Sequence, residues 1–232
     1  SGYCGALGGC GMNFILSIIK PEDLSLLLEI YDRLGLPLTV SFLGKGTAVQ
    51  SMLDLLGIES NERRVVLTVA NRKKTGELMK EQKKSLYMGI PGHGISCSVP
   101  IKSVGGGNTV AYLNQEEKNA KYTPELNFKY ELIVAITNEG HNDQVMNAAR
   151  EAGAGGGTVL HGKGTGAKTA EKFLNVTIAG EKEVILIVAR SDRKSEIMQR
   201  VLEKAGPGTP AGTILFSLPT SEVAGFGMFD ED

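Results

Sequence analysis

Hydrophobic residues gather in short runs that alternate with stretches of helical spacing. Phe14–Ile19 is an unbroken, largely apolar run, and segment 22–34 after it carries leucines at 24, 27, 28 and 34, the intervals of one helix face. Lys20-Pro21 separates the two, because proline ends a strand and suits a helix start. The pattern predicts strands at 14–19, 38–43, 64–70 and 94–100, and helices at 22–34, 48–56 and 75–86.

The second half of the chain repeats this order. Phe14–Ile19 matches Leu132–Thr137 at a distance of 118 positions, and further along Pro100 matches Pro219 at a distance of 119. Such a period exceeds the roughly 20–50 residues of solenoid units and suits two copies of a small domain. Strands are predicted at 131–137, 158–161, 183–189 and 213–218, and helices at 143–151, 170–174 and 195–205.

Each half therefore has the order strand-helix-strand twice, which is typical of a ferredoxin-like α+β domain. Such a domain is an antiparallel four-stranded sheet with both helices on one face. The strands are apolar on their other face as well, so we expect sheets from different repeats to pack together, within the chain or between chains. The predicted segments are a Gly-rich head (1–11), a first domain (12–107), a linker (108–127), a second domain (128–227) and an acidic tail (228–232).

Composition narrows the functional classes. The chain has 232 residues, 41% of them hydrophobic, and a formal net charge of −1. This balance argues against sequence-independent nucleic-acid binding, which needs a basic face. The apolar runs are far shorter than the roughly 20 residues of a membrane span, and no leader pattern is present. We expect a cytoplasmic protein that binds no nucleic acid.

The three cysteines indicate no disulfide framework, because their number is odd. Cys97 falls in a predicted strand, where a free cysteine is usually a small buried apolar group. Cys4 and Cys10 lie in the Gly-rich head, which is interpreted as a flexible extension or an artificial remnant. A metal or redox clip is the alternative for these two.

Two glycine-rich segments in each half could bind an anion. Gly-Lys-Gly-Thr follows the second predicted strand in both halves, either as a phosphate cradle or as a tight turn that needs positive φ. A second glycine-rich turn precedes the last strand of each half, so the two turns could bracket one ligand. The candidate residues are Gly44, Lys45, Gly46, Thr47, Gly92, His93, Gly94, Gly162, Lys163, Gly164, Thr165, Gly208, Thr209 and Gly212.

Other chemistry is weakly indicated. His93, His141 and His161 are not near a second His or Cys at metal-ligand spacing, so solvated or capping roles are favoured over metal ligation. No catalytic arrangement repeats between the halves, which disfavours catalysis. Basic residues at 72–74 and 190–194 follow the third strand of each half. They are either solvated helix starts or an electrostatic lip for phosphates.

The segment Gly140–Gly164 resembles the first helix, second strand and loop base of P-II nitrogen-regulatory signalling proteins. The glycine turn that runs into Ile214–Pro219 resembles the second nucleotide-binding loop and last strand of that family. The likeness covers nearly all of 128–226, and 12–107 more loosely. The chain therefore resembles a tandem of two P-II-like domains.

This resemblance implies ferredoxin-like subunits that close into a trimer, adenine nucleotides bound between neighbours, and a long loop that docks onto a transporter, enzyme or regulator. It places the Gly-Lys-Gly-Thr segments at the base of that loop and the second glycine turns beside the phosphates. Thr213 and Ile95 stand where the family has a phosphate-binding lysine, and its C-terminal arginine pair, loop tyrosine and loop glutamine are missing. Fewer cations favour AMP, ADP or another anion over ATP.

The sequence thus predicts a non-enzymatic regulator of nitrogen metabolism or transport. It would sense an adenine nucleotide or related anion, control a partner protein, and assemble as a homo-oligomer with three-fold P-II-like packing. Two alternatives stay open: a scaffold module without ligand, and a metal-responsive P-II-like relative.

Overall fold

The computed structural model describes residues 11–36, 38–48, 60–101, 126–165 and 179–225, which form two compact units. Unit 1 comprises residues 1–42, 64–127 and 219–232, and unit 2 comprises 43–63 and 128–218. Each unit thus takes in a short segment from the other half of the sequence. The sequence predicted two domains that are each one continuous stretch of chain, 12–107 and 128–227. These bounds stay a prediction.

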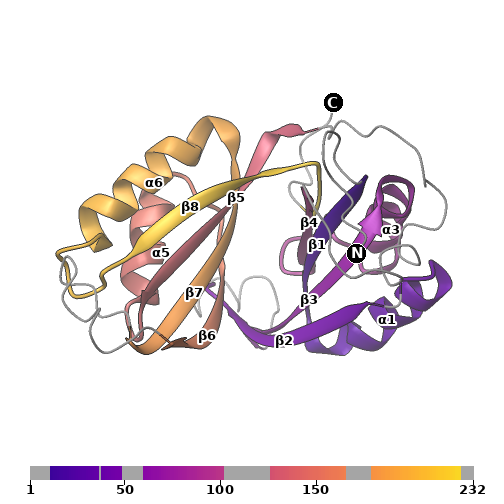
Figure 1. Ribbon diagram of the computed structural model, residues 1–232, viewed down its shortest axis with the longest axis horizontal. Coiled ribbons are helices and arrows are strands. Elements are labelled where there is room, and N and C mark those ends of the chain that lie inside the picture. Colours follow the sequence, from indigo (N-terminus) through magenta and orange to yellow (C-terminus); the bar gives the residue numbers. More distant parts are fainter. Residues whose placement is uncertain (1–10, 37, 49–59, 102–125, 166–178, 226–232) are drawn as a thin grey trace, which may run out of the picture. The chain divides into compact units, whose positions relative to one another are not determined.

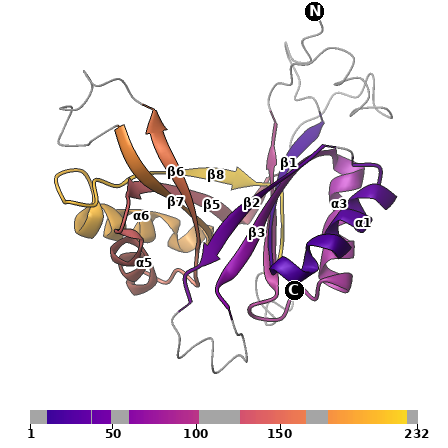
Figure 2. The ribbon, with the colours of Figure 1, turned by 90° about the horizontal axis from the view of Figure 1, so that it is seen from below.

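Unit 1 is built around β1 (Met12–Ile19), which is antiparallel to β3 (Glu62–Asn71) on one side and to β4 (Gly94–Pro100) on the other. The helices α1 and α3 lie on one face of these strands (Figures 1 and 2). The remaining elements are η1 (Pro21–Asp23), α1 (Leu24–Arg33), β2 (Thr39–Gly46, which continues into unit 2), α3 (Arg72–Ser85) and β9 (Glu222–Ala224).

Unit 2 has the strand order β8-β5-β7-β6, and β6 is followed by the end of β2. The helices α5 and α6 pack side by side on one face of the sheet (Figure 1). No helix in the described ranges is long and apolar enough to cross a membrane. The elements are β5 (Asn127–Asn138), α5 (Asn142–Glu151), β6 (Thr158–Thr165), β7 (Ala179–Arg190), α6 (Ser191–Ala205) and β8 (Ile214–Thr220).

Most predicted elements are confirmed, with ends that shift by a few residues. Helix α3 begins at Arg72 rather than 75, because the Asn71 side chain caps it and accepts a hydrogen bond from Lys74 N at 2.9 Å. Strand β9 was not predicted from the sequence. The short helices predicted at 48–56 and 170–174 lie outside the described residues.

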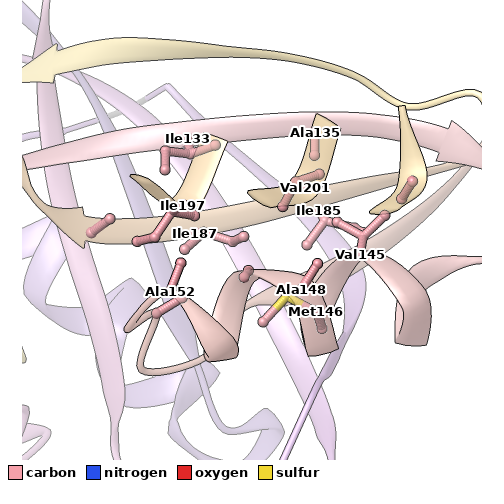
Figure 3. Close-up of a cluster of buried hydrophobic side chains, with 14 of the residues drawn as sticks. Ile133, Ala135, Val145, Met146, Ala148, Ala152, Ile185, Ile187, Ile197 and Val201 are labelled. Atoms are coloured by element: carbon pink, nitrogen blue, oxygen red, sulfur yellow. The ribbon is translucent and has the colours of Figure 1, made fainter. Parts of the chain in front are cut away.

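The core of unit 2 is apolar. Ile133 of β5 and Ile185 and Ile187 of β7 share one face of the sheet, because side chains alternate along a strand. Val145 of α5 and Val201 of α6 pack against them (Figure 3). All five side chains are buried, so the helices and sheet are held together by the hydrophobic effect.

The core of unit 1 is partly polar. Ser17 of β1 donates to Gln82 Oε1 of α3 at 2.7 Å, and Gln82 Nε2 donates to Ser96 Oγ of β4 at 3.2 Å. All three side chains are fully buried. The repeat places Ala135, Val201 and Leu215 at these positions of the second half. Directional hydrogen bonds in unit 1 therefore take the place of apolar contacts in unit 2.

Tyr31 of α1 makes the stability of unit 1 depend on pH. Burial raises the pKa of Tyr31 to about 12, whereas an unfolded chain leaves it near 10. A raised pKa leaves stability intact below about pH 10 and removes it as the pH rises towards 12, because only the unfolded chain then releases the proton. Over this range the wild type should lose roughly 2 kcal/mol of its free energy of unfolding, and Tyr31→Phe should abolish this loss.

Urea unfolding at pH 8 and above pH 11 measures this difference. Tyr87→Phe is the matched control, because that ring is 61% exposed and its phenol is already in water. The same loss of stability at high pH in the Tyr31→Phe protein and the wild type would contradict the assignment.

Candidate functional site

The second Gly-Lys-Gly-Thr segment is a strand, not the turn that the sequence predicted. Residues 162–165 continue β6 and pair with β7, with Gly162 opposite Lys182, Lys163 opposite Glu181 and Gly164 opposite Gly180. The prediction took glycine as a sign of positive φ. Glycine also adopts extended backbone when a partner strand supplies hydrogen bonds, as β7 does here.

The first Gly-Lys-Gly-Thr segment is also extended over most of its length. Gly44, Lys45 and Gly46 end β2, where Lys45 lies opposite Val159 and Gly46 opposite Thr158 of β6. The predicted turn is wrong here too. This segment lies in unit 2 and joins the sheet formed by the second half of the sequence.

Thr47 anchors the first segment to the loop before β6. Its amide and its hydroxyl donate to Gly157 O at 3.1 and 3.0 Å, and its Oγ1 atom lies 3.0 Å from Gly157 N, which donates to it. Arg150, at the end of α5, donates through Nη2 to Thr47 O. The polar groups of Thr47 are therefore engaged in holding β2 against unit 2.

The structure does not bring the two Gly-Lys-Gly-Thr segments together. Gly46 lies opposite Thr158, the first residue of β6, whereas Gly162 lies four positions further along the same strand. At about 3.3 Å per residue, this is a separation of about 13 Å. The two lysines therefore lie at different places along β6, because Lys45 lies opposite Val159 and Lys163 follows four residues later.

The second glycine turn of unit 2 is confirmed. Gly208 and Gly212 have φ values of 95° and 55°, which glycine adopts without strain. Thr209 donates its amide and its hydroxyl to Gly206 O at 3.1 and 2.8 Å, and Gly212 N donates to Thr209 O at 3.0 Å. These amides serve the turn itself, so binding an anion here would also need side-chain cations.

Asn138, at the end of β5, connects this turn to the sheet. Its Nδ2 atom donates to Pro210 O and its backbone N to Ala211 O, both at 2.9 Å, while its Oδ1 atom accepts from Lys182 Nζ at 2.5 Å. Lys182 lies opposite Asn138 on one side and opposite Gly162 on the other. The glycine turn, Lys182 and the start of the second Gly-Lys-Gly-Thr segment therefore share one end of the unit 2 sheet.

Charges around Lys182 are mixed. Burial lowers the pKa of Lys182. Glu139 N donates to Glu181 O at 3.2 Å, so both glutamates belong to this end of the sheet. In the pairing of β6 with β7, Glu181 lies opposite Lys163. Glu139 and Glu181 lower the net positive charge of this end of the sheet, which disfavours a highly charged polyphosphate.

Glu183 occupies the start of α5. Its carboxylate is buried and accepts from Asn142 N and Asn142 Nδ2, both at 3.0 Å, which satisfies the positive end of the helix. His161 Nδ1 lies 3.9 Å from Glu183 Oε1, and His141 Nδ1 lies 3.4 Å from Gln144 Oε1. Within the described ranges, no group of three or more His, Cys, Asp or Glu is placed to hold a metal ion.

The glycine turn of unit 1 carries aromatic side chains. Tyr87 and His93 meet edge to face, with ring centroids 6.3 Å apart, and Tyr87 has a φ of 53°. Gly92 has a φ of 83°. Gly94 has a close-packing role, because a Cβ atom there would lie 2.6 Å from Ile18 O.

Sequence reasoning missed Asn138, Lys182, Arg150 and Gly157. The chain offered a weak signal for Lys182, a charged residue at the start of an apolar strand. The other three depend on strand register and on contacts between distant segments. Cys97 is free and buried, as predicted, and burial raises the pKa of its thiol to about 12.

Unit 2 therefore has the order β5-α5-β6-β7-α6-β8 with both helices on one face of the sheet, which is a ferredoxin-like α+β arrangement. Asn138 connects its glycine turn to Lys182. Residues 130–226 match the family model for nitrogen regulatory protein P-II. The predicted resemblance over 128–226 is confirmed for these residues. The looser resemblance of 12–107 stays a prediction.

The crystal structure of Arabidopsis thaliana PII bound to citrate is similar to this chain. The identity is 26%, the match covers 40% of this chain and 78% of that chain, and the TM-score is 0.32. A search of curated proteins found no match.

Proposed function

We propose that the protein is a P-II-like signal-transduction protein that binds an adenine nucleotide or related anion and regulates a partner protein without catalysing a reaction. The P-II family match of residues 130–226 is the observation that carries the proposal. The arrangement of unit 2 supports it, because the glycine turn, Lys182 and Gly162 lie at one end of its sheet.

The proposed ligand site uses residues of the second half. Gly208, Thr209 and Gly212 shape the turn, and Lys163 and Lys182 supply positive charge. Because Glu139 and Glu181 lie at the same end, AMP or ADP fits this charge balance better than ATP. The residues at 44–47 are assigned a structural role, since Thr47 is bound to Gly157 and Arg150.

The proposed output is control of a transporter or enzyme of nitrogen metabolism. The same proposal includes a homo-oligomer with three-fold packing of P-II-like lobes, in which ligand and partner sites lie between neighbours. Native mass measurement tests this part. A strict monomer would contradict it.

Lys163→Ala should weaken nucleotide binding about tenfold or more, because one charge-assisted phosphate contact contributes about 1.5–3 kcal/mol. Lys45→Ala is the matched control: it removes the same charge from the equivalent motif, at the other end of β6. Isothermal titration with AMP and ADP measures both. An equal loss in the two variants would contradict the assignment of the site to the second motif.

The ligand itself is found by thermal shift against ATP, ADP, AMP, cyclic nucleotides and 2-oxoglutarate. A ligand at 100 times its Kd stabilises the folded state by about 2.7 kcal/mol, which is a shift of several degrees. No shift with any of these compounds would favour the scaffold alternative.

A further inference from the structure

The outer side of helix α3 in unit 1 is strongly basic. The helix contains six basic residues and two glutamates, and its Lys80, Lys83 and Lys84 are exposed to solvent. Tyr87, which follows the last turn of the helix, is 61% exposed. The spacing i, i+3, i+4 and i+7 places the three lysines on one side of the helix, with Tyr87 at its C-terminal end. These four residues are called the basic face.

The lysines of the basic face are not neutralised by carboxylates of their own unit. Glu81, one of the two glutamates of α3, is paired with Arg33 of α1, whose Nη2 atom lies 2.6 Å from Glu81 Oε2. Within the part of the chain that the structure describes, Lys80, Lys83 and Lys84 form no ion pair. Their charges therefore attract an anionic partner.

The turn after α3 holds the aromatic ring of Tyr87 in solvent. Tyr87 has a φ of 53°, which is unusual for a residue with a bulky side chain. Its carbonyl accepts hydrogen bonds from Gly89 N at 2.8 Å and Ile90 N at 3.0 Å, and its ring meets His93 edge to face. Such backbone conformations persist where their surroundings hold them, and they are concentrated at functional sites. Ile90, which is 42% exposed, adds apolar surface to the same turn.

Helix α6, the counterpart of α3 in unit 2, has no basic face. The repeat distance of 119 gives the counterparts of the four residues, which are, in order, Gln199, Leu202, Glu203 and Gly206. None of these is basic or aromatic. The fold thus accepts other residues at the four positions, and the basic face is a property of the first repeat alone.

We propose that the basic face binds an acidic, amphipathic segment of a partner protein. The carboxylates of this segment pair with the three lysines, and an apolar side chain of the segment packs on the ring of Tyr87. Tyrosine is enriched among the residues that contribute most to protein–protein binding, and complementary charge gives such contacts their specificity.

A narrow acidic segment fits this surface better than a membrane or a nucleic acid. Helix α1 packs beside α3 (Figure 2) and exposes Glu29 and Asp32. A wide polyanion that covered both helices would meet these carboxylates and be repelled by them. The cations of the basic face are also lysines, which lack the planar fork with which arginine binds a phosphate through two hydrogen bonds.

The basic face lies in unit 1, whereas the proposed nucleotide site lies in unit 2. The inference therefore does not rest on nucleotide binding. A protein that binds the acidic segment and no nucleotide would refute the proposed function but not this surface. A protein that binds a nucleotide and no acidic segment would do the reverse.

Fluorescence anisotropy with a designed helical peptide tests the surface. The labelled peptide carries glutamates at i, i+3 and i+4 and a leucine at i+7, and it is made with this sequence and with its reverse, because the segment can run in either direction. A second peptide has lysines in place of the glutamates. We expect the full chain to bind the acidic peptide, more weakly as salt screens the charges, and not the lysine peptide. No binding of the acidic peptide, or equal binding of the two, would overturn the proposal.

A variant with the residues of α6 locates the binding. Lys80→Gln, Lys84→Glu and Tyr87→Gly together give α3 residues that the fold accepts in α6, and glycine adopts positive φ without strain. The matched control, Lys45→Gln with Lys204→Glu, removes the same charge from exposed positions of unit 2. We expect the first variant to bind the acidic peptide at least about tenfold more weakly and the control to stay within about twofold of the wild type. An equal loss in both would overturn the proposal, since net charge alone would then explain the binding.

Charge reversal is a second test, whose result a misfolded variant cannot imitate. The protein with Lys80→Glu and Lys84→Glu should lose the acidic peptide and bind the lysine peptide, because the exchanged charges restore the attraction. A variant that loses the first peptide without gaining the second would contradict the proposed contact.

Other occupants of the basic face are distinguished by their own probes. Vesicles that contain phosphatidylserine and a single-stranded RNA are compared with the acidic peptide on the wild type and on the variant with the α6 residues. Tighter binding of vesicles or RNA that this variant abolishes would overturn the proposal. Binding of the acidic peptide only after deletion of Phe226–Asp232 would also overturn it, because the chain's own acidic tail would then be the occupant.

Discussion

Deletion of Ser221–Asp232 should lower the free energy of unfolding of unit 1 by at least about 4 kcal/mol, because it removes four hydrogen bonds of Ser221 and Glu222, worth about 1 kcal/mol each, together with the pairing of β9 with β4. Ser221 and Glu222 make three of these with Ser98, and the Ser221 hydroxyl donates to Asn13 Oδ1 at 3.1 Å. Small domains are stable by about 5–15 kcal/mol in total. We therefore expect unit 1 to open far more often than in the full chain, while unit 2 keeps its stability.

Deletion of Phe226–Asp232 alone is the matched control, since it keeps β9 and Gly225. Hydrogen exchange resolves the two units: in the longer deletion, peptides from β1 and β4 should lose protection, whereas peptides from β5 and α5 should keep it. Unchanged protection of β4 would show that β9 contributes little to unit 1. Equal loss in both deletions would assign the effect to the tail beyond residue 225.

Strand β9 shows where prediction of the fold from the sequence fails. The long elements were predictable, because β5 and β7 are apolar over many positions and α6 carries Ile197 and Val201 at helical spacing. A three-residue strand has no such period. Its position depends on Ser98, which lies more than a hundred residues earlier in the chain. Hydrogen bonding across that distance leaves no local pattern in the sequence.

The candidate site was predictable in its glycine turn but not in its partners. The spacing of Gly208 and Gly212 before an apolar run indicated a turn, and both residues have positive φ. The contact between Lys182 and Asn138 requires the register of β5 on β7, which residue types alone do not set. For the same reason Gly162 and Gly46 suggested turns, although their partner strands hold them extended.

The polar core of unit 1 was also beyond the sequence pattern. Ser17 interrupts an apolar run and Gln82 lies in a helix rich in lysine, so each residue alone suggests a solvated position. Their buried side chains bond to each other and to Ser96. Buried polar residues become recognisable only when their partners are known.

Gly157→Val should lower the free energy of unfolding of unit 2 by about 4 kcal/mol, from overpacking of about 1–3 kcal/mol together with lost hydrogen bonds to Thr47. A Cβ atom at this position would lie 2.9 Å from Met146 Sδ and 3.2 Å from both Ile187 Cγ1 and Leu186 O. The methionine can move, but Leu186 O belongs to the backbone of β7 and cannot yield without disturbing the sheet.

The neighbouring glycines are matched controls in the same loop. Nothing lies within 4 Å of a Cβ atom built at Gly155 or Gly156, so Gly155→Val and Gly156→Val should leave stability within about 1 kcal/mol of the wild type. Urea unfolding measures the free energy of unfolding of all three variants. Hydrogen exchange of the β6 amides shows whether the sheet is disturbed beside the loop. Equal effects at the three positions would contradict the close packing assigned to Gly157.

Thr47→Val separates the hydrogen bonds from the packing, because it keeps the shape of the side chain and removes the hydroxyl that bonds to Gly157 N and O. It should cost about 2 kcal/mol and raise hydrogen exchange at Lys45 and Gly46. If nucleotide affinity is unchanged in Thr47→Val, the first Gly-Lys-Gly-Thr segment serves to dock β2 onto unit 2. A loss of affinity as large as that of Lys163→Ala would instead return this segment to the ligand site.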